Sequence, residues 1–143
     1  MKIKITKKQH KYGPFRIYYE DTDAGKIVYY ANYFKFAERA RTEMLRSAGF
    51  DHQTLMRDFG FGFAVRKCSA DYRMPAILDD ELEVLTRITA VTGARIVMQQ
   101  TIRRGEDILT VVDVTLACLG ITGRGIRMPE QIFAALLTYV DAA

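Results

Sequence analysis

Ala-Asn-Tyr-Phe-Lys-Phe-Ala-Glu-Arg-Ala-Arg-Thr-Glu-Met-Leu-Arg-Ser-Ala, residues 31–48, has the strongest helical pattern in this chain. Its apolar residues recur at spacings of three and four, as on one face of a helix: Tyr33, Ala37, Ala40, Met44 and Ala48. Phe34, Phe36 and Leu45 widen that face beyond what a helix covered on one side needs. Gly49 follows as a natural stop. The stretch predicts one long helix, Ala31–Ala48, wrapped on more than one side by a sheet.

Segments with strand periodicity flank this predicted helix on both sides. One segment precedes it, Phe15–Tyr19, and four follow it: Phe61–Arg73, Glu81–Ala90, Arg95–Arg103 and Ile108–Leu119. Short turn-like sequences join the last three segments, which is typical of an antiparallel meander. Pro129 then suits the first turn of a final helix. This order of elements predicts an α+β domain in which the long helix packs on an antiparallel sheet.

The composition fits one compact globular domain, because 143 residues contain 49% hydrophobic and 27% charged side chains. The net charge is +4, but residues 1–12 alone carry five lysines and no acid, so the rest of the chain is near neutral. We expect a basic N-terminal arm at 1–12 and a single folded domain at 13–143. A basic arm on a neutral body is only weak evidence for nucleic-acid binding, and we expect no nucleic-acid partner. It gives only weak support to contact with an anionic membrane surface.

The cysteine content and the apolar runs predict the compartment. Cys68 and Cys118 are too few for a disulfide framework or a zinc site, and both lie in predicted strands, where we expect buried side chains. The chain opens without the apolar core of a secretory signal, and its apolar runs are too short to span a membrane. These features predict a reduced, cytoplasmic location.

Three carboxylates, at Glu20, Asp21 and Asp23, precede the predicted helix in a tyrosine-rich stretch. One interpretation is helix capping, because acids before a helix interact favourably with its dipole. A metal site would need a histidine or a fourth acid nearby, and the sequence offers neither, so we expect no metal. Capping accounts for one acid, but not for an Asp-x-Asp followed by Ala-Gly and two tyrosines. The segment is therefore the candidate for chemistry.

The pattern Asp21-Thr-Asp-Ala-Gly-Lys-Ile-Val-Tyr-Tyr-Ala-Asn-Tyr33, followed by Glu38-Arg-Ala-Arg-Thr-Glu43, resembles the 4-hydroxybenzoyl-CoA thioesterase family of hotdog-fold proteins. Within that family it is most similar to YbgC-like acyl-CoA thioesterases, and the resemblance covers about residues 14–120. It implies a hotdog fold, in which an antiparallel five-stranded sheet wraps around a long central helix. It also implies a homo-oligomer in which two sheets pair side by side, and we expect a homotetramer, a dimer of dimers.

The resemblance implies that the catalytic carboxylate is the second acid of Asp-x-Asp, which is Asp23. Seven positions later the YbgC-like branch usually has His, whereas this chain has Tyr30, as the 4-hydroxybenzoyl-CoA branch does. A mechanism that needs an imidazole at that position therefore does not apply. The chain's histidines, His10 and His52, are expected at the surface and outside the chemistry. A related thioesterase class uses a glutamate on the helix, which makes Glu38 the second candidate.

Hydrolysis of a thioester needs a nucleophile and donors that stabilise the oxyanion. An aspartate can attack directly or can activate water as a general base, and the sequence leaves both routes open. We expect backbone N–H groups near Tyr30 and Ala31, at the start of the helix, to hold the carbonyl oxygen. Gly25 permits a close approach of the backbone. Asn32 either orients the loop or caps the helix.

The other charged residues have weaker assignments. CoA carries phosphates, and we expect three bases in or beside predicted strands to meet them: Arg66, Lys67 and Arg95. Glu38 and Glu43 are expected to form ion pairs along the helix with neighbouring arginines, which are Arg39, Arg41 and Arg46.

The predicted activity is hydrolysis of a small or medium acyl-CoA, or of an acyl thioester of acyl carrier protein (ACP), to free acid and thiol. No cofactor is expected. A hotdog hydratase is one alternative, and the lack of a suitably placed His counts against it. A non-catalytic module that binds acyl-CoA or acyl-ACP is the other, and the complete motif around Asp23 counts against it.

Overall fold

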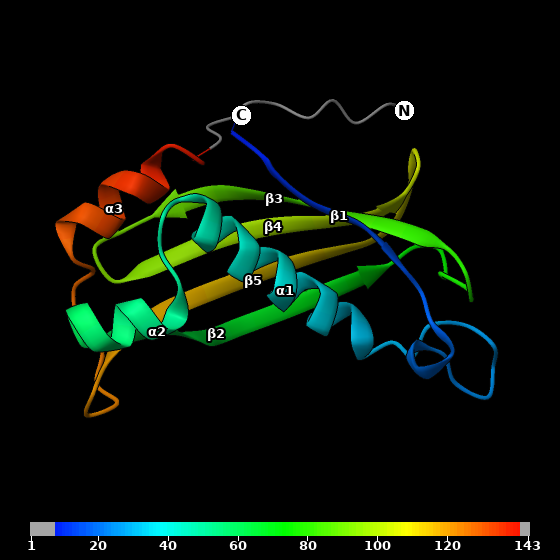
Figure 1. The fold of residues 1–143 in the computed structure, drawn as a ribbon, viewed down its shortest axis with the longest axis horizontal. Helices are drawn as coiled ribbons and strands as arrows, with labels where there is room; N and C mark the ends of the chain where they lie inside the picture. Colours follow the sequence, from blue (N-terminus) through cyan, green and yellow to red (C-terminus); the bar gives the residue numbers. More distant parts are fainter. Residues whose placement is uncertain (1–7, 141–143) are drawn as a thin grey trace.

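The computed structural model describes residues 8–140, which form one sheet packed against a long helix (Figure 1). The strands are β1 (His10–Arg16), β2 (Phe61–Tyr72), β3 (Glu81–Val91), β4 (Arg95–Arg104) and β5 (Asp107–Gly120). Their order across the sheet is β1-β3-β4-β5-β2, and every neighbouring pair is antiparallel. The predicted α+β class and the five-stranded antiparallel sheet of a hotdog fold are confirmed.

The long helix α1 (Asn32–Ser47) crosses one face of the sheet (Figure 1). Its buried side is the predicted apolar face, with Tyr33, Phe36, Ala37, Ala40, Met44 and Leu45. Ala37 and Ala40 are fully buried, and their small side chains let the helix lie close to the sheet. Alternate residues of β4, including Ile96, Met98 and Ile102, complete the core from the sheet side. α1 is the predicted helix, shorter by one residue at each end.

The elements after α1 follow the predicted plan closely. β2 to β5 match their predicted segments to within one residue at each end. The final helix, α3 (Glu130–Leu137), begins directly after Pro129, which occupies the N-cap position. α3 buries Ile132 and Leu136 in the core, so it closes the end of the sheet near the C-terminus of α1 (Figure 1).

The first strand lies earlier in the chain than predicted. β1 covers His10–Arg16, whereas the apolar alternation pointed to Phe15–Tyr19, and Tyr19–Asp21 forms a 3-10 turn instead. The lysine-rich surroundings concealed the strand, because Lys11 lies at the sheet edge and forms an ion pair with Glu83 at 3.1 Å. Residues 10–12 of the predicted basic arm therefore belong to the sheet. Residues 1–7 of that arm lie outside the described residues.

A short helical segment that the sequence pattern does not predict follows α1. α2 (His52–Thr54) continues as a π-helical turn, η2 (Leu55–Phe59). The Asp51 carboxylate accepts a hydrogen bond from the backbone N–H of Thr54 at 2.8 Å and so caps α2. Only Leu55 of this segment is buried, which is too little apolar periodicity to indicate a helix.

The two cysteines differ in burial. Cys118 is buried in β5, as predicted, and burial raises the pKa of its thiol to about 11. Cys68 is exposed on β2, so the expectation of a buried side chain is wrong at that position. Cys68 is exposed because β2 lies at the edge of the sheet. Within residues 8–140, β2 pairs only with β5, so no strand covers its other side.

The two histidines, both expected at the surface, differ in burial. His52 is exposed, as expected, whereas His10 is half-buried at the start of β1. The His10 Nε2 lies 3.1 Å from the Ser47 hydroxyl oxygen, and the His10 ring meets the Tyr139 ring edge-on. Burial lowers the pKa of the His10 imidazole, and the negative charge of Glu43 opposes this shift only in part.

We expect the partial burial of His10 to make stability depend on pH. Because its pKa is lower in the folded chain, the unfolded chain binds more protons below about pH 6.5. Stability is therefore greatest above that pH and falls as the pH drops through it. Between about pH 8 and about pH 5.5, Tm should fall less in His10→Gln than in the wild type. The exposed His52→Gln is the matched control, and a His10→Gln profile parallel to the wild type would contradict the prediction.

Within residues 8–140, no helix is long and apolar enough to cross a membrane. The same part of the chain holds no group of three or more His, Cys, Asp or Glu side chains that could bind a metal ion.

Candidate active site

The loop of residues 22–28, called here the Asp23 loop, connects β1 to α1 and folds back on itself. Thr22 and Val28 form an isolated antiparallel bridge, and the N–H of Asp23 donates to the Ile27 carbonyl at 3.0 Å. Lys26 turns the chain with a φ of +66°, and its N–H donates to the Asp23 carbonyl at 2.9 Å. The loop is thus a tight hairpin, and its tip is exposed to solvent.

The Asp23 carboxylate is exposed and is held through one oxygen. Its Oδ1 accepts a hydrogen bond from the N–H of Gly25 at 2.8 Å, which forms an Asx turn. A Cβ at position 25 would lie 3.1 Å from that oxygen, so Gly25 leaves room for the contact. The structure gives Oδ2 no hydrogen-bond partner among residues 8–140. This oxygen is available to take a proton or to reach a substrate.

Asp21 and Asn32 tie the Asp23 loop to the start of α1. The side-chain amide of Asn32 donates to the Asp21 carbonyl at 2.9 Å, and the N–H of Tyr29 donates to the same oxygen at 3.0 Å. The Asp21 carboxylate accepts from the N–H of Tyr18 at 2.8 Å. Ala31 is the N-cap of α1 and offers no side-chain cap. Asn32 was open to two interpretations, a cap for the helix or a contact that orients the loop. The structure shows the contact with the loop.

Two backbone N–H groups at the start of α1 are available to a ligand. Neither Tyr30 nor Ala31 donates its N–H to an acceptor among the residues that the structure describes. The Tyr30 carbonyl accepts from the Tyr72 hydroxyl at 3.0 Å, which fixes this peptide from β2. Because the first turn of a helix carries partial positive charge, such donors can stabilise a developing oxyanion.

Exposed tyrosines surround this end of α1. The rings of Tyr29 and Tyr30 are 4.9 Å apart, and the Tyr30 ring meets that of Tyr72 edge-on at 6.2 Å. A hydrogen bond with Tyr30 raises the pKa of Tyr29, and the negative charge of Asp23 acts in the same direction. The Tyr29 hydroxyl is therefore protonated at neutral pH, where it is a hydrogen-bond donor and not a base.

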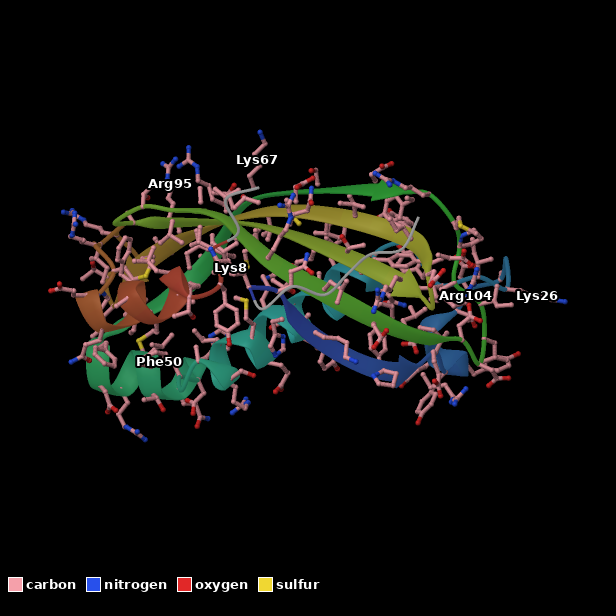
Figure 2. The ribbon with its side chains drawn as sticks, turned by 90° about the horizontal axis from the view of Figure 1, so that it is seen from above. Lys8, Lys26, Phe50, Lys67, Arg95 and Arg104 are labelled. Atoms are coloured by element: carbon pink, nitrogen blue, oxygen red, sulfur yellow. The ribbon has the colours of Figure 1, made fainter. Side chains whose placement is uncertain are left out.

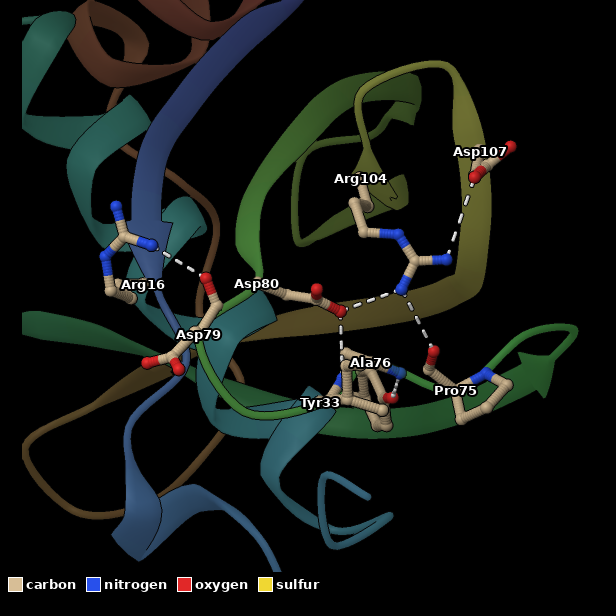
Figure 3. A network of polar contacts seen from close by, with 9 residues as sticks. Arg16, Tyr33, Pro75, Ala76, Asp79, Asp80, Arg104 and Asp107 are labelled. Atoms are coloured by element: carbon tan, nitrogen blue, oxygen red, sulfur yellow. Dashed lines mark hydrogen bonds and ion pairs between the residues drawn. The ribbon is translucent and has the colours of Figure 1, made fainter. Parts of the chain in front are cut away.

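A polar network supports the Asp23 loop from the side of the sheet (Figure 3). Arg104 of β4 forms an ion pair with Asp80 at 2.7 Å, and this contact raises the pKa of the guanidinium. The N–H of Ala76 donates to the buried Tyr33 hydroxyl of α1 at 3.0 Å. The Ala76 carbonyl accepts from the N–H of Val28 at 2.9 Å. The segment between β2 and β3 thus holds the loop and the helix in one arrangement.

A cavity of about 390 Å³ lies farther along α1. Its walls are mainly apolar, with Met44, Leu45, Met56, Gly62, Phe63, Val65, Ile96, Met98, Leu116 and Leu136. Glu38, Arg41, Thr42 and His52 form its polar part. Asp23 does not line it, and Glu38 stands about 9 Å along the helix axis from Asn32. The cavity and the Asp23 loop are therefore separate regions of one chain.

The bases expected to meet CoA phosphates lie away from the Asp23 loop. Arg66, Lys67 and Arg95 are exposed, and the strand register places Lys67 and Arg95 on the face of the sheet opposite α1. Figure 2 shows both side chains projecting from that face. Arg66 occupies the position where the register of β2 shifts between Val65 and Lys67. The structure brings Gly25, Tyr30, Ala31 and Asn32 together with Asp23, but not these bases, whose role stays a prediction.

Several residues around the site are not predicted by sequence patterns. Tyr72 and Ala76 come from a distant part of the chain, and no local motif signals their contacts with the loop. Arg41 was expected to form an ion pair on the helix surface, but it turns inward and donates to Gln100 at 3.1 Å. Among the expected helix ion pairs within residues 8–140, the structure shows only that of Glu43 and Arg46, at 3.5 Å.

The sequence is similar to known thioesterases. The sequence profile of the thioesterase superfamily matches residues 25–111. An acyl-CoA thioesterase YbgC of Haemophilus influenzae is 42% identical over 123 residues, which cover 85% of this chain and 90% of the relative. An acyl-CoA thioester hydrolase YbgC of Escherichia coli O6:H1 is 48% identical over 107 residues, which cover 74% of this chain and 79% of the relative.

Solved structures agree with the sequence matches. A probable thioesterase from Bartonella henselae has a TM-score of 0.78 at 35% identity, with 85% of this chain and 98% of that chain covered. A Staphylococcus aureus protein solved in complex with CoA has a TM-score of 0.84 at 15% identity, over 97% of this chain and 87% of that one, and so shares the fold. Because the profile spans more than half of the chain and relatives exceed 40% identity, the chain belongs to the thioesterase superfamily, as its resemblance to YbgC-like hotdog proteins indicated.

Proposed function

We propose that the chain is an acyl-CoA thioesterase whose catalytic carboxylate is Asp23. One observation carries the proposal. Among residues 8–140, one oxygen of the Asp23 carboxylate has no hydrogen-bond partner, and the start of α1, just after the hairpin, carries two unpaired N–H groups, those of Tyr30 and Ala31. The YbgC relatives are acyl-CoA thioesterases by name, which supports acyl-CoA as the substrate class.

Asp23 acts by one of two routes. As a general base it takes a proton from water, whose oxygen adds to the thioester carbon, while the N–H groups of Tyr30 and Ala31 hold the oxyanion. The C–S bond then breaks, and the thiolate takes the proton from Asp23, which leaves a free acid and the CoA thiol. As a nucleophile, Asp23 adds to the carbon itself and expels the thiolate, and water then hydrolyses the mixed anhydride.

Glu38 is the second candidate for the catalytic carboxylate. It lines the cavity next to Thr42, so a ligand in that cavity would meet its side chain. The unpaired N–H groups lie at the start of α1 and not beside Glu38, because N–H groups in the middle of a helix are used by the helix itself. Asp23 therefore fits the requirements of the reaction better.

A substrate screen tests the proposed activity. The purified chain is assayed against acyl-CoA thioesters of increasing chain length, one aromatic acyl-CoA and one acyl-ACP, with release of free thiol as the readout. We expect turnover with the highest kcat/KM on small or medium acyl groups. Failure to release thiol from every substrate would overturn the proposal. Tight binding of acyl-CoA without turnover would indicate a non-catalytic module, and hydration of an enoyl-CoA would indicate a hydratase.

We also infer a homo-oligomer that pairs through β2. This strand is twelve residues long and lies at the sheet edge, and its Val65 and Tyr72 side chains are 52% and 44% exposed. A free edge of this length is a template for another strand. Antiparallel pairing about a two-fold axis brings the Phe61 end of one β2 beside the Tyr72 end of the other. The cavity of one copy would then approach the Asp23 loop of its partner.

Light scattering at micromolar concentration checks this inference. We expect a particle several times heavier than the 16.3 kDa chain, with a homotetramer, a dimer of dimers, as the main species. A stable particle of 16.3 kDa that remains fully active would contradict both the oligomer and the shared site.

The cytoplasmic location remains part of the proposal. Cys68 and Cys118 are both free thiols, as is usual in a reducing compartment. The proposed reaction needs no cofactor, because water, Asp23 and the backbone donors account for every bond that forms or breaks.

A further inference from the structure

Arg41 is a largely buried cation that the proposed chemistry does not use. It projects from α1 toward the sheet, where its Nη1 donates a hydrogen bond to Oε1 of Gln100 in β4 at 3.1 Å. Burial lowers the pKa of the guanidinium, while Cys68 and Glu38 act in the opposite direction. Arg41 therefore lies in a partly dehydrated environment, in which its positive charge interacts strongly with any nearby anion.

The surrounding residues leave most of the guanidinium without a partner. Gln100 is fully buried, and its Nε2 donates to the Ala37 carbonyl at 2.8 Å and to the Thr86 hydroxyl at 3.0 Å, which points Oε1 toward Arg41. Gln100 is the only hydrogen-bond partner that residues 8–140 give the guanidinium, although it has five N–H groups. No carboxylate in this part of the chain forms an ion pair with Arg41, whereas exposed Arg46 on the same helix pairs with Glu43.

The free side of Arg41 faces the cavity described above. Arg41 belongs to the polar part of that cavity, and the rest of its wall is mainly apolar. Six of the apolar lining residues are fully or nearly fully buried: Met44, Leu45, Ile96, Met98, Leu116 and Leu136. A single buried cation on the wall of an apolar cavity is complementary to a hydrocarbon chain that ends in a carboxylate, because a guanidinium binds a carboxylate through two parallel hydrogen bonds.

We propose that this cavity binds aliphatic chains that carry a carboxylate, with the carboxylate on Arg41 and the hydrocarbon among Met98, Leu116 and Leu136. Two molecules supply this chemistry. One is the free fatty acid that hydrolysis of an acyl thioester releases, and the other is an acyl thioester with a second carboxylate at the far end of its chain. Glu38 also lines the cavity, and its negative charge would repel either molecule if Arg41 were neutral. The guanidinium is therefore the group on which binding depends.

Isothermal titration of the wild-type chain with octanoate and with 1-octanol tests the proposal without any substitution. The two probes have the same hydrocarbon chain and differ in the charged end. We expect octanoate to bind at least about tenfold more tightly, the usual scale of a charge-assisted hydrogen bond. Equal affinities, tighter binding of octanol, or no binding of either probe would overturn the proposal.

Substitutions then identify the group that binds the carboxylate. Arg41→Gln should weaken octanoate binding at least about tenfold and leave octanol within about twofold, because only the charged contact is lost. Arg41→Lys keeps the charge but lacks the planar fork of the guanidinium, so its affinity for octanoate should lie between those of the wild type and Arg41→Gln. Arg46→Gln is the matched control on the exposed side of α1 and should bind both probes as the wild type does. Circular dichroism confirms that each variant is folded, and unchanged octanoate binding in folded Arg41→Gln and Arg41→Lys refutes the assignment.

A kinetic comparison distinguishes the two sources of the carboxylate. If the ligand is a dicarboxylic acyl thioester, Arg41→Gln should lose kcat/KM for adipoyl-CoA but not for hexanoyl-CoA. If the ligand is the product, octanoate should inhibit the wild type and inhibit Arg41→Gln much less, with both substrates affected alike. If the folded variant shows neither effect, the proposal is contradicted. Asp23→Asn should still bind octanoate, so a failure of the proposed hydrolysis would leave this binding result intact.

Discussion

Asp23→Asn should lower kcat for the best acyl-CoA substrate by at least about 100-fold, the scale of losing a general base. Asparagine keeps the shape of the side chain, and its amide oxygen can still accept from the N–H of Gly25. It cannot take a proton from water or add to a carbonyl carbon, so both routes of hydrolysis are lost. Because Asp23 is exposed, Tm should change little. Steady-state thiol release and thermal unfolding measure the two effects separately.

Two matched variants control for the removal of a negative charge. Glu20→Gln removes an exposed acid just before the Asp23 loop and should leave kcat within about twofold. Glu38→Gln removes the carboxylate of the cavity and should cost far less than Asp23→Asn. Near-normal turnover in Asp23→Asn together with an inactive Glu38→Gln would place the catalytic carboxylate on α1 instead.

Gln100→Leu should lower the free energy of unfolding by about 3 kcal/mol, because leucine fills a similar space but cannot form a hydrogen bond. In the wild type the buried amide serves the Ala37 carbonyl, the Thr86 hydroxyl and the Arg41 guanidinium. Each of these groups would remain dehydrated without its partner, and the charged one contributes the largest penalty. Urea denaturation measures the loss through a lower midpoint at an unchanged slope.

The neighbouring Gln99 provides the control for this substitution. Gln99 lies on the other face of β4 and is partly exposed, where it accepts from Arg87 and donates to Asp113. Gln99→Leu should cost less than about 1 kcal/mol, because water can replace the lost contacts. Adding Arg41→Met to Gln100→Leu should recover part of the stability, since the unpaired buried charge is removed. Similar losses for Gln99→Leu and Gln100→Leu would contradict this account.

Most of the fold could be predicted because most of its elements have one regular buried face. α1 and the strands from β2 to β5 repeat their apolar residues at the period of the element, so their bounds are visible in the chain. β1 could not be placed correctly, because its pairing with β3 shifts register between Tyr12 and Phe15 and Lys11 interrupts the apolar pattern. The η2 turn depends on tertiary contacts of Leu55, which no local pattern encodes.

The candidate site was predictable where its parts are close in the sequence. Asp23, Gly25 and Asn32 belong to one short motif, and the structure brings them together within a hairpin and a helix start. The inward orientation of Arg41 was not predictable, because its partner Gln100 lies in another strand and surface arginines on helices usually pair with nearby acids. A polar residue among the apolar positions of β4 was the one available signal.

The hydrogen bonds of the Asp23 loop have a consequence for how such an enzyme can evolve. The contacts that shape the carboxylate site and orient its helix are mostly made between residues 18 and 32, as one continuous peptide. The cavity is assembled instead from side chains of α1, α2, η2, β2, β4, β5 and α3. Mutations that reshape the cavity can therefore leave the proposed catalytic loop unchanged. Selection can thus exchange one acyl group for another in small steps, each of which passes through an active enzyme.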